Sequence, residues 1–434
     1  MMLSSTRDAT ERFNLTGGIL VDLYRGHNFT VVDDLLGGDF WLDVDQFAER
    51  DFPNNPDSYQ NDLDHPDNAV GEGDIFANNH YAFQRGGTLW GTARYDNKRY
   101  SVYLGGHART TSMWREGLMR KGLFPDNSLG ESDHLEYLTW GMKAGGDYRF
   151  TGRHLVVANA LITTQPPLFR NSFLSPRTRN SVTPDLREET ILSGDISYIL
   201  RSPAIRGRIT GYYTRFRDQT EVTSFYHDDY RTLVNYAMTG IDKENYGMEA
   251  GAEVNLTSEL VVNAVASLGQ FLWANNPDIT ITRDNNSTVL SNEEVWIQYF
   301  RQSGTPQTAL ALGLEYNSSR FWWAGITGSY YDNIYLDFNP VSRTKDETGK
   351  YLYWKMQKKA DPGYLVDLFL GKSWKIDDFY LNLSANLSNI LNNRTLMTGG
   401  YEQYRFDPDR PELFQPRVYY NNGFNYFINL SIRY

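Results

Sequence analysis

The chain has 434 residues and a net charge of -11, with 40% hydrophobic and 15% aromatic residues. No stretch approaches the roughly 18 to 20 consecutive apolar residues of a membrane-spanning helix, which excludes a bundle of membrane helices. The acidic balance argues against a nucleic-acid partner. The absence of cysteine excludes thiol nucleophiles, thiolate metal sites and disulfides. Because composition does not shift sharply, we expect one domain over residues 1–434.

The opening "MMLSSTRDATERF" has no apolar core of the kind that a signal peptide needs. From residue 11 onward, two alternating strands joined by a short turn are followed by a long polar loop, and this unit repeats. We predict about fourteen strands, at 11–23, 79–95, 99–117, 135–150, 153–165, 189–201, 206–228, 243–256, 259–275, 305–317, 320–336, 362–374, 378–391 and 422–434. The long loops are 24–78, 118–134, 166–188, 229–242, 276–304, 337–361 and 392–421.

The alternation is clearest at 138–150, 246–256, 310–316, 379–387 and the terminal "FNYFINLSIRY". Small residues interrupt the apolar face, which suits contact with lipid better than a tightly packed core. Aromatic residues lie near the strand ends, as an aromatic girdle at a membrane interface would require: Tyr148, Phe150, Tyr246, Tyr316, Phe379 and Tyr434. The pattern predicts an all-β, antiparallel transmembrane β-barrel, with a soluble all-β protein as the alternative.

Turn lengths alternate strictly between short and long, and in a membrane barrel this asymmetry sets the orientation. Short turns lie in the periplasm and long loops lie outside the cell. The final strand then runs inward and ends at the periplasm. With an even number of strands, residues 1–10 are expected on the periplasmic side as well.

The most distinctive polar feature is the long acidic loop within 24–78, where residues 33–74 hold 13 Asp or Glu and a single Arg or Lys, Arg50. Oxygen ligands at this density could hold Ca²⁺, but their spacing matches no known Ca²⁺ loop, so we interpret the segment as a solvated extracellular loop. Long loops carry recognition in receptors. The candidates for ligand contact are Trp41, Asp43, Asp45, Tyr59, Asp64 and Asp67.

Catalytic and metal-binding motifs are missing from the sequence. The seven histidines form no metal-binding pattern, "GESDH" (130–134) lacks the fold that a triad requires, and no nucleotide fingerprint occurs. We therefore expect no enzyme activity, no metal and no cofactor. Charged residues on the polar strand faces are predicted to face the lumen or a plug domain: Lys143, Asp147, Arg149, Asp195, Arg208, Glu249, Glu253, Glu315 and Asp367.

Two terminal segments resemble a known family. "LNLSANLSNILNNR" (381–394) resembles the penultimate strand and turn of TonB-dependent outer-membrane receptors, and "NYFINLSIRY" resembles their last strand. The stretches 175–203, 207–226 and 234–251 look like receptors of this family from Bacteroidetes-type bacteria. The resemblance implies that Tyr434 is the signal read by the barrel-assembly machinery. It also implies a barrel of about 22 strands around a plug.

A signal peptide, a TonB box and a plug are not visible in this sequence, so we expect the chain to be a C-terminal fragment or a truncated gene product. The predicted function is the barrel of an outer-membrane receptor for TonB-energised uptake of a bulky nutrient in a Gram-negative bacterium. The expected partners are outer-membrane lipid, the assembly machinery, TonB through the missing plug, and a small-molecule, glycan or peptide ligand. The alternatives are a complete, passive porin of about fourteen strands and a soluble protein that binds or hydrolyses glycans.

Overall fold

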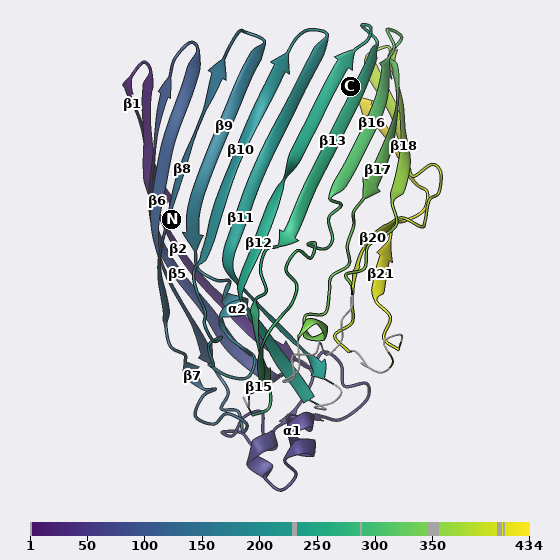
Figure 1. Ribbon diagram of the computed structural model, residues 1–434. Coiled ribbons are helices and arrows are strands. Elements are labelled where there is room, and N and C mark those ends of the chain that lie inside the picture. The colour runs from purple at the N-terminus through teal and green to yellow at the C-terminus, as the bar shows by residue number, and fades with distance from the viewer. Residues whose placement is uncertain (1, 228–231, 287–288, 345–355, 406–409, 411–412) are drawn as a thin grey trace.

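The computed structural model of the chain describes residues 2–227, 232–286, 289–344, 356–405, 410 and 413–434. Within these residues the main sheet has 18 strands, and its neighbours pair in antiparallel fashion. Figure 1 shows the sheet as a curved wall of tilted strands, with the short turns at the top and the long loops at the bottom.

Of the described strands, fifteen long ones follow one another along the wall. They are β1 (Met2–Thr10), β2 (Phe13–Val31), β5 (Ile75–Asp96), β6 (Tyr100–Gly117), β8 (Leu135–Arg149), β9 (His154–Gln165), β10 (Glu189–Arg201), β11 (Ile205–His227), β12 (Thr232–Asn255), β13 (Leu260–Trp273), β16 (Thr308–Asn317), β17 (Trp322–Asp332), β18 (Gly363–Ile376), β19 (Phe379–Ser388) and β22 (Asn425–Arg433).

Shorter elements lie among the loops. The main sheet is extended by β7 (Gly130–Glu131), β14 (Asp278–Arg283) and β15 (Val289–Glu294), while β3 (Trp41–Leu42) pairs with β4 (Ala69–Val70) and β20 (Met397–Tyr401) with β21 (Arg417–Tyr420). The helices are α1 (Gln46–Asp51), α2 (Phe169–Ser172), η1 (Pro56–Tyr59) and η2 (Val341–Arg343). These elements build the end of the molecule that carries the long loops.

The predicted fold class is confirmed, and each of the fourteen predicted strands overlaps one strand of the wall, with ends that differ by up to several residues. The expectation for residues 1–10 is wrong, because residues 2–10 form a further strand, β1, which pairs with β2 from Met2 opposite Leu20 to Thr10 opposite Phe13. The number of wall strands in the described chain is therefore odd, and the argument from an even count fails.

Two loop predictions also differ from the structure. Most of the predicted loop 229–242 is the first part of β12, and the predicted loop 276–304 contains the hairpin of β14 and β15. The acidic loop is shorter than predicted, because β2 continues to Val31 and β5 begins at Ile75. Parts of four predicted loops lie outside the described residues: 229–231, 287–288, 345–355, 406–409 and 411–412. Residue 228, at the end of a predicted strand, also lies outside them.

The outer face of the wall carries many exposed apolar side chains. A soluble protein rarely exposes aliphatic residues on this scale. Cross-strand register places these side chains on one face, and alternate residues on the other. The exposed aliphatic residues of this face include Leu15, Ile19, Leu89, Leu104, Leu138, Met142, Ile196, Ile209, Met248, Leu310, Leu312, Leu314, Ile326, Leu370 and Leu383. Lipid is the environment that covers such a surface.

Exposed aromatic side chains border this belt at the end with the short turns. They are Tyr100, Tyr148, Phe150, Tyr198, Phe321, Trp322, Trp374, Phe379 and Tyr434. Tyr148 contacts Phe150 with ring centroids 5.0 Å apart, and Phe379 contacts Tyr434 at 5.3 Å. Tyr213, Tyr246, Tyr330 and Tyr364 are exposed nearer the other end of the wall. This distribution is that of two aromatic girdles at the membrane interfaces.

A charge on the outer face should destabilise the wall, whereas the same charge on the inner face should not. Leu312 is 62% exposed on the outer face, and its neighbour Ala311 points to the inner face. We expect Leu312→Arg to lower the free energy of unfolding in lipid vesicles by about 2–4 kcal/mol, because an arginine near the bilayer centre loses its hydration. Ala311→Arg is the matched control, and denaturant titration in vesicles measures both. Equal effects of the two substitutions would contradict a lipid-facing outer surface.

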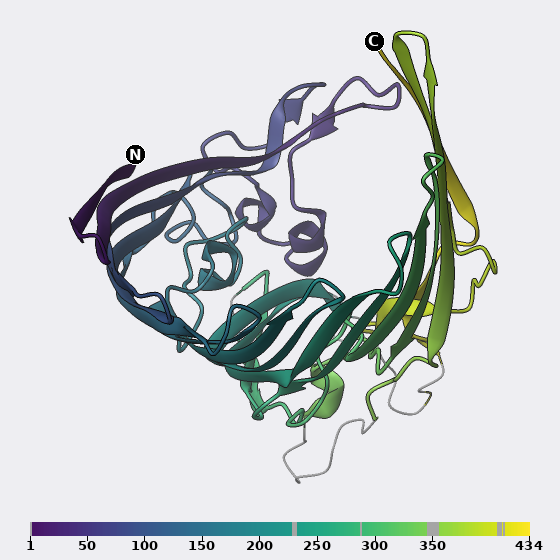
Figure 2. The ribbon, with the colours of Figure 1, turned by 90° about the horizontal axis from the view of Figure 1, so that it is seen from above.

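The described wall is open on one side. Pairings run without a break from β1 to β22 along the wall, and among the described residues none joins β22 to β1. Figure 2 shows the separation between the two ends of the sheet, and the acidic segment with α1 lies on the concave side. The terminal strand, which a closed barrel would pair with the first, is an edge strand here.

The main apolar core of the described chain lies at the loop end of the wall. It is formed by β12, β13, β14 and the segments around Val295 and Phe338. The buried residues of this core, which we call the loop-end core, are Val234, Tyr236, Met238, Ile241, Trp273, Ile279, Ile281, Val295, Ile297, Phe300, Phe338 and Val341. The long loops are therefore packed structure, able to hold side chains in fixed positions.

Candidate ligand-binding site

The acidic segment between β2 and β5 is a small folded unit at the loop end, which we call the acidic unit (residues 32–74). Its chain enters through β3 and returns through β4, with α1 and η1 between them. Asp45 caps α1, because its carboxylate accepts hydrogen bonds from the backbone N–H groups of Phe47 (3.0 Å) and Ala48 (3.1 Å).

A buried polar network ties the acidic unit to the rest of the protein. The Asp43 carboxylate accepts hydrogen bonds from the Asn61 side chain (2.8 Å) and the Ala77 N–H (2.9 Å). The Lys121 ammonium donates to the Asn61 side-chain oxygen (3.2 Å) and to the carbonyl of Ala77. Lys121 is 6% exposed, and burial lowers its pKa to about 8. Three separate segments are held together by these four residues.

A cavity of about 290 Å³ lies between the acidic unit and the neighbouring loops. Trp41, Phe47, Phe76 and Phe124 supply aromatic surface to it. Its charged lining residues are Asp45, Lys121, Arg177 and Asp284, and Gln46, Gln60, Asn61 and Asn78 add polar groups. Apolar walls with a few directed polar groups are characteristic of ligand sites.

The charges of the cavity are mostly engaged within the protein. Asp284 accepts a hydrogen bond from Asn235 (2.9 Å) and lies 3.4 Å from the fully buried Arg179. Arg179 also lies over the ring of Phe124 at 4.7 Å, and burial lowers its pKa. Arg177 is 4.0 Å from Asp284, but its side chain is 53% exposed. Arg177 is therefore the cavity charge that is most accessible to a ligand.

The structure separates the six predicted ligand-contact residues. Trp41 and Asp45 line the cavity, and Asp43 is buried in the network described above. Asp64 pairs with Arg120 (3.0 Å), and Asp67 accepts from the Gln60 amide (3.0 Å). The Tyr59 carbonyl accepts the backbone N–H of Asp45 (2.8 Å). These four residues hold the shape of the acidic unit. Trp41 and Asp45 lie at the cavity, and their contact with a ligand stays a prediction.

Three of the four charged residues of the cavity were not found in the sequence analysis: Lys121, Arg177 and Asp284. They come from the loop after β6, the loop after β9 and the turn after β14. No local motif marks them, and the available signal was that their loops were predicted on the same side as the acidic segment. Across the residues that the structure describes, no group of three His, Cys, Asp or Glu could hold a metal ion.

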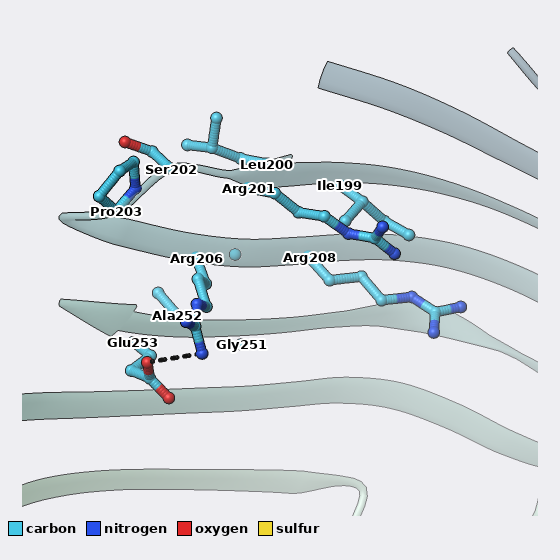
Figure 3. Close-up of a pocket in the computed structure, with 11 residues that line it drawn as sticks. Ile199, Leu200, Arg201, Ser202, Pro203, Arg206, Arg208, Gly251, Ala252 and Glu253 are labelled. Atoms are coloured by element: carbon cyan, nitrogen blue, oxygen red, sulfur yellow. Dashed lines mark ion pairs between the residues drawn. The ribbon is translucent and has the colours of Figure 1, made fainter. Parts of the chain in front are cut away.

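The predicted inward-facing charges share the concave face of the wall. Cross-strand partners run in one row from Asp147 through Val157, Ser197 and Thr210 to Glu249. Figure 3 shows a hollow on this face near the short turns, with Arg201, Arg206 and Arg208 around it. Arg206 lies 3.5 Å from Glu253. The concave face near the short turns of β10–β12 is therefore rich in arginine, although the whole chain is acidic.

Most of the other predicted inward-facing residues have partners within the wall. Asp147 pairs with Arg149 at 2.8 Å, and Asp195 accepts from Asn159 at 3.1 Å. Glu315 accepts from Asn263 (2.9 Å) and Asp367 from the Asn389 N–H (2.7 Å), while Lys143 lines a second hollow beside Trp90 and His107. Whether this face holds a plug stays a prediction.

The burial of His80 predicts that the loop end loses stability in acid. It is 4% exposed on the part of β5 beyond the lipid-facing belt, and burial, with Arg115 nearby, lowers its pKa to about 4. Its ordinary pKa of 6.5 is higher, so the stability linked to this shift is present above pH 6.5 and lost as pH falls through 4. We expect the free energy of local opening at the loop end to be about 3 kcal/mol lower below pH 4 than at neutral pH. Hydrogen exchange checks this, and His80→Gln, which cannot titrate, should show a smaller loss; an identical loss would contradict it.

No family model and no curated protein matches the chain. No helix in the described ranges is long and apolar enough to cross a membrane. Solved structures do match, and they share the wall of tilted antiparallel strands. The chain has the barrel fold of TonB-dependent outer-membrane receptors.

Three of these structures show the extent of the likeness. The ferric-catecholate import receptor Fiu from E. coli K12 is 12% identical, with a TM-score of 0.56 over 99% of this chain and 53% of Fiu. The copper transporter OprC is 12% identical, with a TM-score of 0.62 over 99% of this chain and 55% of OprC. The siderophore receptor PiuA from Acinetobacter baumannii is 12% identical, with a TM-score of 0.58 over 99% of this chain and 55% of PiuA. The chain thus spans about half the length of the structures it matches.

Proposed function

We propose that this chain forms the outer-membrane wall of a TonB-dependent receptor in a Gram-negative bacterium, and that its loops capture a bulky nutrient. The observation that carries the proposal is the aromatic-lined cavity of about 290 Å³ at the loop end of a wall with an apolar outer face. Loops above a membrane wall are where a ligand from outside would first bind. The wall and the cavity together support capture and transfer, and no bond of the ligand is made or broken.

A plug domain would complete this function. Arg201, Arg206 and Arg208 on the concave face offer cations to an acidic plug surface, and a plug would connect the lumen to TonB. Lys143, Asp147, Arg149, Asp195, Glu249, Glu253 and Asp367 would hold the plug or border the ligand route. Tyr434 is 87% exposed beside Phe379, so its ring is accessible to the assembly machinery. The belt of exposed aliphatic residues would contact outer-membrane lipid.

Single cysteines test the location and orientation, because the chain has no cysteine of its own. Asp57→Cys lies in the acidic unit, and Asn97→Cys lies in the short turn between β5 and β6. In intact cells that make the protein, a membrane-impermeant maleimide should label Asp57→Cys and leave Asn97→Cys unlabelled until the outer membrane is permeabilised. Labelling of Asn97→Cys but not Asp57→Cys on intact cells would indicate the opposite orientation. Labelling of neither would contradict a location of the acidic unit at the cell surface.

A further inference from the structure

A second, smaller pocket lies at the loop end, away from the cavity of the acidic unit. Its volume is about 40 Å³, and it is bordered by β11, β12, β13, β14 and the segments around Asp337 and Tyr404. The lining residues that matter here are Glu221, Tyr236, Trp273, Asp337, Phe338 and Tyr404. Four aromatic rings and two carboxylates therefore converge on a space of limited size.

The aromatic rings form fixed walls. The rings of Trp273 and Phe338 meet edge to face, with centroids 5.2 Å apart and planes at 75°. Those of Tyr236 and Tyr404 are 6.4 Å apart at 81°, and Phe225 stacks behind Tyr404 at 4.6 Å. The faces of such rings attract cations through their quadrupole. One cation already uses this surface, since the Lys243 ammonium lies 4.4 Å from the centre of the Trp273 ring.

The charges around the pocket do not balance. Glu221 is paired with Lys243 at 2.6 Å, and Glu402 is paired with the buried Arg343. Asp337 has no ion pair among the described residues; its carboxylate accepts one hydrogen bond, from the Phe338 N–H (3.1 Å). Asp337 is exposed, and the Lys243 ammonium is the one cation that acts on it among the described residues. The pocket therefore has two carboxylates, Glu221 and Asp337, against a single ammonium group.

The backbone at Asp337 is held on both sides, so the carboxylate is attached to an ordered part of the loop end. The Asp337 N–H donates to the Gly400 carbonyl (2.9 Å), and the Asp337 carbonyl accepts the N–H of Glu402 (2.8 Å). A space of roughly 10–15 Å³ accepts one water molecule, so the pocket accepts a small group and excludes a large one.

We propose that this pocket binds the cationic ammonium group of a ligand, with Asp337 as counter-ion and the faces of Tyr236, Phe338 and Tyr404 as walls. The group would be the end of a larger, amine-bearing molecule, because the pocket admits only a small head. The proposal names a ligand class for the receptor function above and rests on it for its biological meaning. Its test measures binding alone, so a negative result would leave the receptor proposal in place.

The probe is methylammonium, with methanol as the neutral molecule of similar size. Saturation-transfer NMR on the whole chain in lipid nanodiscs measures the binding of both at neutral pH. We expect methylammonium to bind at least tenfold more tightly than methanol. Asp337→Asn should weaken methylammonium binding at least tenfold and leave methanol unchanged. Asp278→Asn, which removes one exposed carboxylate from the start of β14 nearby, is the matched control and should bind as the wild type does.

Two results would overturn the proposal. Equal binding of methylammonium and methanol by the wild-type chain would show that charge is not recognised. Equal binding of methylammonium by the wild type and Asp337→Asn would place the cation elsewhere. If Asp337→Asn does not fold, the comparison of the two probes on the wild-type chain still decides the question. Lys243→Met gives a further check, since freeing Glu221 should tighten methylammonium binding several-fold.

Discussion

Replacing Glu402 with glutamine is expected to destabilise the loop-end core by roughly 3–5 kcal/mol, because it leaves a buried guanidinium without its anion. The Arg343 side chain is fully buried, and that of Glu402 is 9% exposed. Arg343 donates to one carboxylate oxygen of Glu402 at 2.8 Å, and the other oxygen accepts the Asn339 N–H at 3.1 Å. The pair joins η2 to the segment after β20, so its loss should loosen both.

Hydrogen exchange of the amides of β12, β14 and the segment around Phe338 measures this effect. Glu294→Gln is the control, since Glu294 is an exposed residue at the end of β15 and its replacement should leave exchange unchanged. The double variant Arg343→Met, Glu402→Leu should recover much of the loss, because an apolar pair of similar volume needs no counter-charge. Unchanged protection in Glu402→Gln would show that the pair does not hold the loop-end core together.

The wall could be predicted because alternation is a local property of the sequence, and every predicted strand with a clear apolar face was found. β1 was missed for a physical reason: "MLSSTRDAT" is polar on both faces, and its place in the sheet depends on pairing with β2. The first part of β12 was missed although Val234, Tyr236 and Met238 alternate. Gly240 has φ 66° there, and register shifts near Asp218 in β11 interrupt the pattern.

The candidate site could be predicted only in part. The density of carboxylates marked the acidic segment, and two of the six residues predicted to contact a ligand, Trp41 and Asp45, lie at the cavity. The use of Asp43 inside a network could not be read from the sequence, because its partners Asn61 and Ala77 are brought near it by folding. Lys121 and Asp284 are further away still in the chain. Whether a carboxylate meets a ligand or an internal donor depends on tertiary contacts that no local pattern contains.

Replacing Lys121 with methionine should release the acidic unit, and this is the second large effect that we expect. Methionine keeps the length of the side chain but donates no hydrogen bond, so the buried oxygens of Asn61 and Ala77 lose their donor. Each such loss costs about 1–3 kcal/mol, and we expect opening of the unit to become easier by about 2–4 kcal/mol. Methionine avoids the cost of burying a charge, which keeps the effect below the full sum of the lost bonds.

Trypsin measures this opening, because Arg50 in α1 is the one Arg or Lys of residues 33–74. Cleavage after Arg50 requires α1 to unfold locally, so its rate follows the population of the open unit. If the free energy of opening falls by about 2 kcal/mol, cleavage after Arg50 should become about thirtyfold faster. Lys98→Met makes the same chemical change at an exposed position in a short turn and should not alter cleavage at Arg50. Equal cleavage rates in Lys121→Met and the wild type would mean that the apolar contacts of the cavity, and not the buried network, hold the acidic unit in place.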